Sequence, residues 1–120
     1  MNMRTVDIGI LRAPRIKFDF TGDFSLNGMP VPQKNDLFIG DGRIRYRGED
    51  YERLEFKPLG KESLFTLHDV VIGVNFHWQR KEDQSFRGEL IFVVEDGEVR
   101  AINRLPVEEY LVSVISSEMS

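Results

Sequence analysis

The sequence has no cysteine, no run of apolar residues long enough to cross a membrane, and no excess of basic residues. The lack of cysteine excludes disulfide bonds and thiolate metal sites, but it fits an oxidising and a reducing compartment equally well. No apolar run reaches the roughly 18 residues of a transmembrane helix. The formal net charge is −4, without the basic stripe that a nucleic-acid-binding surface needs. We therefore expect no nucleic-acid partner and no transmembrane segment.

The first residues also lack the apolar core of a secretion signal, so the sequence by itself assigns no compartment. What the sequence does have is enough apolar material for a core, because 41% of its 120 residues are hydrophobic. A chain of this size closes about one hydrophobic core. We therefore expect one small domain.

Alternation of apolar and polar residues indicates that most of the chain forms β-strands. Between residues 70 and 78, every second residue is apolar, which is the period of a half-buried strand. Trp78 belongs to this stripe, so we predict a core position for it rather than a platform for sugar rings. The next apolar stripe consists of Phe86, Leu90, Phe92 and Val94. The charged run Arg80–Gln84 between the stripes predicts a solvated hairpin loop.

Asp96-Gly97 is the clearest turn signal, because a type I′ hairpin turn needs positive φ at both central residues. Counting outward from this turn places Val94 opposite Val99 and Phe92 opposite Ala101. Apolar side chains then meet on one face of the hairpin, which favours this register.

Further turn signals recur at short intervals in the first half of the chain. We predict hairpins around Thr21-Gly22 and Asn27-Gly28, turns at Gly40–Gly42 and Gly48–Asp50, and strands at Tyr51–Phe56 and Ser63–Leu67. Roughly eight to ten short strands of this kind predict a mainly β fold. We expect an antiparallel, hairpin-rich sandwich or barrel-like domain with one C-terminal helix.

The predicted helix divides the chain into a β-rich domain at residues 1–104 and a helix at residues 105–120. Pro106 suits a first helical turn, and the acidic pair Glu108-Glu109 favours the positive end of the helix dipole. The apolar stripe of this helix is formed by Val107, Leu111, Val114 and Ile115. Glu118 is the next position on the same stripe, so it lies on the apolar side of the predicted helix.

The same segment resembles the signature of the SpoIID/LytB family, the stage II sporulation protein D and amidase-enhancer group. The resemblance rests on Ile102–Leu111, Val114 and Ser117–Met119, with weaker similarity at Phe86–Leu90 and Val6–Leu11. It implies peptidoglycan chemistry in the cell envelope, with glycan strands as the substrate. The sporulation members of the family are lytic transglycosylases, and their catalytic glutamate corresponds to Glu118.

The family sequences continue past the position of Ser120 with further helices, so we expect these 120 residues to be part of a larger protein. A glutamate that acts as general acid and base needs a walled cleft, which one helix cannot supply. We therefore expect the 120 residues to fold alone but not to cleave glycan alone.

Two alternatives to the enzyme stay open. The name amidase enhancer implies an interaction protein that stimulates a separate cell-wall amidase, for which Glu118 could be dispensable. A carbohydrate-binding or structural module is the other alternative. Without the resemblance, a glutamate near a chain end would be interpreted as a solvated side chain.

The other residues that could carry chemistry have simpler interpretations. His68 and His77 lack a third ligand at a recognisable spacing, so we expect ordinary surface or strand-end histidines and no metal site. Four aspartates fit no calcium-binding loop and are interpreted as turn residues, namely Asp36, Asp41, Asp50 and Asp83. We expect no cofactor.

Overall fold

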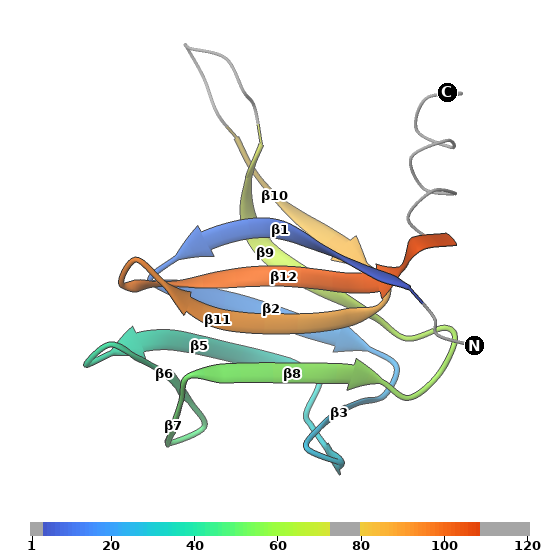
Figure 1. Ribbon diagram of the computed structural model, residues 1–120, viewed down its shortest axis with the longest axis horizontal. Coiled ribbons are helices and arrows are strands. Elements are labelled where there is room, and N and C mark those ends of the chain that lie inside the picture. The colour runs from blue at the N-terminus through green and yellow to red at the C-terminus, as the bar shows by residue number, and fades with distance from the viewer. Residues whose placement is uncertain (1–3, 73–79, 109–120) are drawn as a thin grey trace.

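The computed structural model of the chain describes residues 4–72 and 80–108. These residues form twelve strands in two six-stranded antiparallel sheets, which face each other as an open sandwich (Figure 1). The predicted mainly β fold is therefore confirmed, and the arrangement is a sandwich. No helix among the described residues is long and apolar enough to span a membrane.

The first sheet has the strand order β1-β12-β11-β8-β3-β4. Its strands are β1 (Thr5–Ala13), β12 (Glu98–Pro106), β11 (Glu89–Glu95), β8 (Arg53–Pro58), β3 (Phe24–Leu26) and β4 (Met29–Pro30). The second sheet has the order β10-β9-β2-β5-β6-β7. Its strands are β10 (Arg80–Phe86), β9 (Leu64–Ile72), β2 (Arg15–Thr21), β5 (Lys34–Gly40), β6 (Arg43–Tyr46) and β7 (Glu49–Tyr51).

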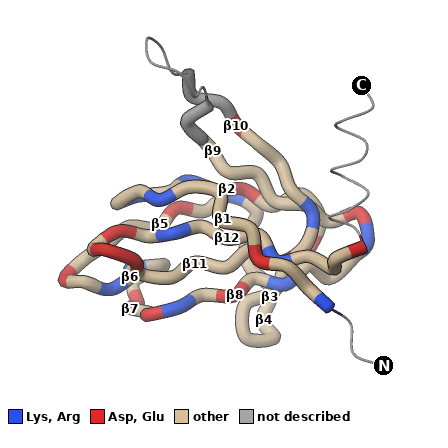
Figure 2. The backbone as a smooth tube through the Cα atoms, turned by 45° about the horizontal axis from the view of Figure 1, so that its top comes forward, with Lys and Arg blue, Asp and Glu red and all other residues tan. Residues whose placement is uncertain are grey.

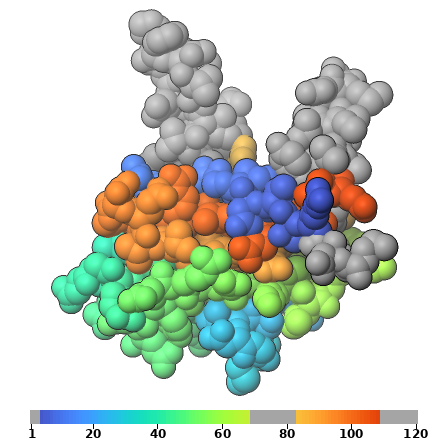
Figure 3. Space-filling model, in the orientation of Figure 1, coloured from blue at the N-terminus to red at the C-terminus, as the bar shows by residue number. Residues whose placement is uncertain are grey.

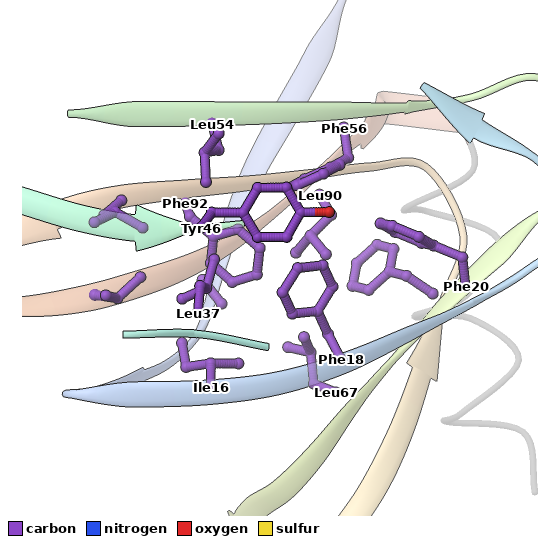
Figure 4. Packing of buried hydrophobic residues seen from close by; sticks show 14 of the residues in the cluster. Ile16, Phe18, Phe20, Leu37, Tyr46, Leu54, Phe56, Leu67, Leu90 and Phe92 are labelled. Carbon is purple, nitrogen blue, oxygen red and sulfur yellow. The ribbon is translucent and has the colours of Figure 1, made fainter. Parts of the chain in front are cut away.

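Aromatic side chains from both sheets fill the space between them (Figure 4). Phe18 of β2 lies at the centre, with ring centroids 4.9 Å from Phe92 of β11 and 5.5 Å from Phe56 of β8. Phe20 of β2 stacks on Phe24 of β3 at 4.3 Å. Because β2 belongs to one sheet and its partners belong to the other, these contacts join the two layers.

The hairpin at Asp96-Gly97 has the predicted conformation, with φ of 52° and 77° at the two central residues. The structure pairs Val94 with Val99 and Phe92 with Ala101, which confirms the predicted register. Phe92, Val99 and Ala101 are fully buried, so the hairpin places its apolar face in the core.

The prediction of a hairpin at Thr21-Gly22 was wrong. Gly22 has a φ of 83°, but β2 pairs with β5 and β9, whereas β3 pairs with β4 and β8. The turn therefore carries the chain from the second sheet to the first. Phe18 and Phe20 before the turn and Phe24 after it all point into the same core, although β2 and β3 belong to opposite sheets. The apolar pattern is therefore the same as that of a hairpin.

Two other turns were predicted well, and a third is shifted by one residue. Asn27-Gly28 joins β3 to β4, and Asp41-Gly42 joins β5 to β6, with positive φ at all four residues. The turn predicted at Gly48–Asp50 lies at Arg47-Gly48, because Glu49 already pairs with Tyr46.

The charged run Arg80–Gln84 was predicted as a loop, and the structure instead places it in β10. This strand pairs with β9 and forms one edge of the second sheet. Charged residues are common on edge strands, where they discourage pairing with other chains, so charge alone does not indicate a loop. Phe86 and Leu90 consequently lie in opposite sheets rather than on one continuous stripe.

β12 ends at Pro106, and the backbone is helical at Val107 and Glu108, the last two described residues. The change from strand to helix therefore lies after Pro106, slightly beyond residue 105. The rest of the predicted helix, with Glu118, lies outside the described residues, as does the stripe of residues 74–78 with Trp78.

The central position of Phe92 predicts a large loss of stability when its ring is removed. We expect Phe92→Ala to lower the free energy of unfolding by about 3–5 kcal/mol, because the deletion leaves a cavity between two packed sheets. The matched control is Phe38→Ala, since Phe38 is 44% exposed and should cost less than about 1 kcal/mol. Urea unfolding of the three proteins measures both values, and equal losses would contradict the described packing.

Candidate functional site

Glu118 lies outside the described residues, and β12 is the last described strand before it in the sequence. Three segments carry the sequence pattern noted above, namely Val6–Leu11, Phe86–Leu90 and Ile102–Leu111. β1 pairs with β12, and β12 pairs with β11, so the parts of these segments on the three strands are hydrogen-bonded neighbours. Figure 1 shows the three strands side by side, with the chain continuing from the end of β12.

Asn103 fixes the connection between β10 and β11. Asn103 is only 6% exposed, and its side-chain amide Nδ2 donates hydrogen bonds to the backbone oxygens of Arg87 at 2.8 Å and Glu89 at 3.2 Å. The oxygens belong to residues on either side of Gly88, where the chain crosses from the second sheet to the first. Asn103 therefore ties this crossover to the last strand.

Gly88 is required at the crossover for two reasons. Its φ is 97°, a conformation that side chains disfavour. A Cβ atom at this position would lie 2.6 Å from the backbone oxygen of Arg104, which is too close for any non-bonded contact. The crossover therefore packs directly on the backbone of β12.

Arg104 lies beside this contact on the outer face of the first sheet. Its Nε and Nη2 atoms donate to the two carboxylate oxygens of Asp7 at 2.7 and 3.0 Å, a two-point contact between β12 and β1. The hydrogen bonds from Arg104 hold the pKa of Asp7 below its ordinary value, and the same contact raises the pKa of Arg104. Glu55 of β8 lies 4.0 Å from the guanidinium on the other side.

A hollow of about 370 Å³ lies at this end of the sandwich. It is bordered by the end of β12, the start of β1, the crossover at Gly88 and the loop after β8. Its charged lining residues are Lys57, Lys61, Arg87, Glu89 and Arg104. Basic residues therefore predominate here, whereas Figure 2 shows basic and acidic residues interspersed along most other strands.

A second cluster lies on the outer face of the second sheet, around His68 of β9. Its Nε2 atom is 2.8 Å from Oδ2 of Asp19 on β2, and its Nδ1 atom is 3.1 Å from Oδ2 of Asp83 on β10. Partial burial lowers the pKa of His68, but the hydrogen bonds to the two carboxylates outweigh this effect and raise the pKa above its ordinary value. The protonated imidazole can donate to both partners at once.

Sequence reasoning missed this cluster because its members come from three strands. Asp83 was interpreted as a turn residue, but it lies on β10. Asp36 and Asp50 also lie on strands, β5 and β7, where they form salt bridges with Arg15 and Arg45 of neighbouring strands. Of the four aspartates, only Asp41 occupies a turn. Asp19 lies next to His68 because β2 pairs with β9, and this pairing joins residues 49 positions apart in the sequence.

Within the described part of the chain, no group of histidine, cysteine, aspartate and glutamate side chains could hold a metal ion. His77 lies outside that part, so the pair of His68 and His77 is not described. Comparison of the chain with protein-family models, curated proteins and solved structures finds no match.

The close packing at the crossover predicts that Gly88 is much less replaceable than a glycine of positive φ in open space, such as Gly28. We expect Gly88→Ala to lower the free energy of unfolding by about 3 kcal/mol, from backbone strain and from the clash with the oxygen of Arg104. Gly28→Ala is the control, because Gly28 has a similar φ of 81° and a Cβ atom added there would have no other atom within 4 Å. It should cost about 1 kcal/mol. Thermal unfolding that ranks the two variants equally would contradict the contact.

The environment of His68 predicts a stability that depends on pH. Because the pKa of His68 is raised in the folded protein, protonation stabilises the fold. This contribution is fully present below the unfolded pKa of about 6.5 and is lost as the pH rises through the folded pKa. Relative to His68→Gln, the parent should therefore be more stable at about pH 5 than at about pH 8.

Nuclear magnetic resonance titration of the imidazole measures this pKa directly. Asp19→Asn should lower the pKa of His68, because it removes one of the two carboxylate partners. Asp36→Asn is the matched control, since Asp36 pairs with Arg15 on the same sheet face. A pKa of His68 that does not change in Asp19→Asn would rule out the described hydrogen bond.

Proposed function

We propose that the chain belongs to a peptidoglycan-acting protein similar to the SpoIID/LytB group and that Glu118 acts in cleavage of glycan strands. The proposal rests first on the residues from Ile102 to Met119, whose order and spacing resemble the signature of that group. It implies a location in the cell envelope and glycan strands as the substrate.

One structural observation supports the proposal. The resemblance covers segments that lie far apart in the sequence, and the parts of these segments on β1, β11 and β12 lie on adjacent strands of one sheet, whereas Phe86 lies on β10 of the other sheet. Asn103 of the signature segment binds the backbone on both sides of Gly88 in the weaker segment. Residues of the separate segments that resemble the family thus contact one another in the fold. A resemblance that arose by chance would not be expected to select neighbouring residues.

The proposed reaction needs a single carboxyl group. Protonated Glu118 donates its proton to the glycosidic oxygen as the bond between that oxygen and the sugar C1 atom breaks. The resulting carboxylate accepts the proton of the 6-hydroxyl group of the same sugar, whose oxygen forms a new bond to C1. The products are a free hydroxyl end and a 1,6-anhydro end, and the proton is returned to Glu118. No water is consumed, so a second carboxylate is not needed to activate one.

Glu118→Gln in the full-length protein tests this role, because glutamine keeps the shape of the side chain but cannot donate or accept the proton. We expect the cleavage rate of purified glycan strands to fall by about 10²–10⁴-fold, measured as 1,6-anhydro products by mass spectrometry. Glu108→Gln is the matched control, since Glu108 is exposed at the helical turn after β12 and should leave cleavage unchanged.

Two results would contradict the proposal. Undiminished cleavage by Glu118→Gln would exclude that residue as the general acid. Absence of cleavage by the parent, together with stimulation of a cell-wall amidase by both parent and variant, would favour the amidase-enhancer alternative. Glycan binding without either activity would favour a carbohydrate-binding module.

A further inference from the structure

Three exposed basic side chains gather at one end of the sandwich, and the salt bridges that most other described arginines form do not include them. The charge of Lys57 helps to lower the pKa of Glu55, but the two side chains form no salt bridge. Arg12, Arg15, Arg43, Arg45, Arg53, Arg100 and Arg104 each form a salt bridge. Lys57, Lys61 and Arg87 are exposed, and within the described ranges none of them forms a salt bridge. All three line the 370 Å³ hollow beside the crossover at Gly88.

Three separate elements supply these charges. Lys57 lies near the end of β8, Lys61 lies in the loop that follows it, and Arg87 lies in the connection between β10 and β11. Among the described residues that line the hollow, Glu89 alone is acidic, and Arg104 adds a further guanidinium already bound to Asp7. The hollow thus gathers positive charge in a protein whose net charge is −4. Cations brought together against their mutual repulsion favour an anion between them.

Hydrogen bonds fix the backbone of the segments that form the walls of the hollow. Asn103 fixes the carbonyl groups on both sides of Gly88, and Ser63 donates a 3.2 Å hydrogen bond to the backbone oxygen of Asp23. Leu59 adds a backbone hydrogen bond of 2.8 Å to the same oxygen. The backbone of the loop with Lys61 is therefore fixed to the turn at Asp23, and the connection with Arg87 is fixed to β12, so less ordering of the backbone is needed when a ligand binds.

We propose that this hollow is a binding site for a carboxylate or phosphate group. The group lies among Lys57, Lys61 and Arg87, which donate charge-assisted hydrogen bonds to its oxygens. Lys57 also borders a second hollow of about 260 Å³, formed with the β3–β4 hairpin, so the surface continues past the anion site along β8. In the space-filling view the light-blue β3–β4 hairpin projects below the green segment that contains β8 (Figure 3). A group carried on a saccharide chain can therefore extend along the surface, whereas a free anion occupies only the first hollow.

This inference does not depend on Glu118 or on glycan cleavage. It is tested by titrating the 120-residue chain with sodium phosphate, with a hyaluronan tetrasaccharide, which carries carboxylates, and with chitotetraose, an uncharged amino-sugar chain. Isothermal titration calorimetry gives the affinities, and backbone amide chemical shifts locate the site. We expect phosphate to shift the amides near Lys61 and Arg87, and chitotetraose to leave them unchanged. Binding should weaken as salt is raised, because salt screens exposed charges.

The double variant Lys57→Gln with Lys61→Gln should weaken anion binding about tenfold or more. The matched control is Lys17→Gln with Lys34→Gln, which removes the same charge from exposed lysines of the second sheet and should leave the affinity unchanged. If hyaluronan also binds and competes with phosphate, the anion is one carried on a saccharide; if only phosphate binds, the ligand is a small anion. Absence of binding by both anions, or an equal loss in the two double variants, would overturn the proposal.

Discussion

The contact of Phe18 with Phe56 and Phe92 is the interaction on which the sandwich depends. Two open sheets have no shared hydrogen bonds, so packing of side chains between them must hold them together. The three phenylalanines are all fully buried and come from β2, β8 and β11, near the middle of each sheet. The other residues of the buried cluster come from the same two sheets and complete the layer between them.

The first sheet also buries an apolar residue on its outer face, away from the core. Ile91 is fully buried, although it alternates with Leu90 and Phe92 and therefore points away from the core. Salt bridges on the same face join Arg53 to Glu55 and Arg104 to Asp7. Long charged side chains can cover apolar surface with their stems, so a sheet of this kind can bury residues on both faces.

The sequence predicted the local structure better than the arrangement of strands. Positive φ at Asp96-Gly97 and the pairing of Val94 with Val99 follow from a two-residue turn, whose geometry depends on adjacent residues alone. The turn at Gly22 has the same local signal, but β2 and β3 separate into different sheets because of pairing with distant strands. The neighbours of His68 were missed for the same reason, since nothing near position 68 indicates Asp19. Asn103 was noticed only as part of a sequence pattern, and its contacts with the Gly88 connection became visible in the structure.

The pairing of β1 with β12 has a consequence for the order in which the protein folds. The contact of Asp7 with Arg104 joins residues 97 positions apart, and among the described strands only β12 is a hydrogen-bonded neighbour of β1. At synthesis rates of about 5–20 residues per second, β1 leaves the ribosome several seconds before its partner exists. During that interval Val6 and Ile8 belong to an unpaired apolar strand, the kind of segment that associates with other chains. β1 is thus the earliest of the described strands, yet it can pair only after β12, the last of them, has emerged.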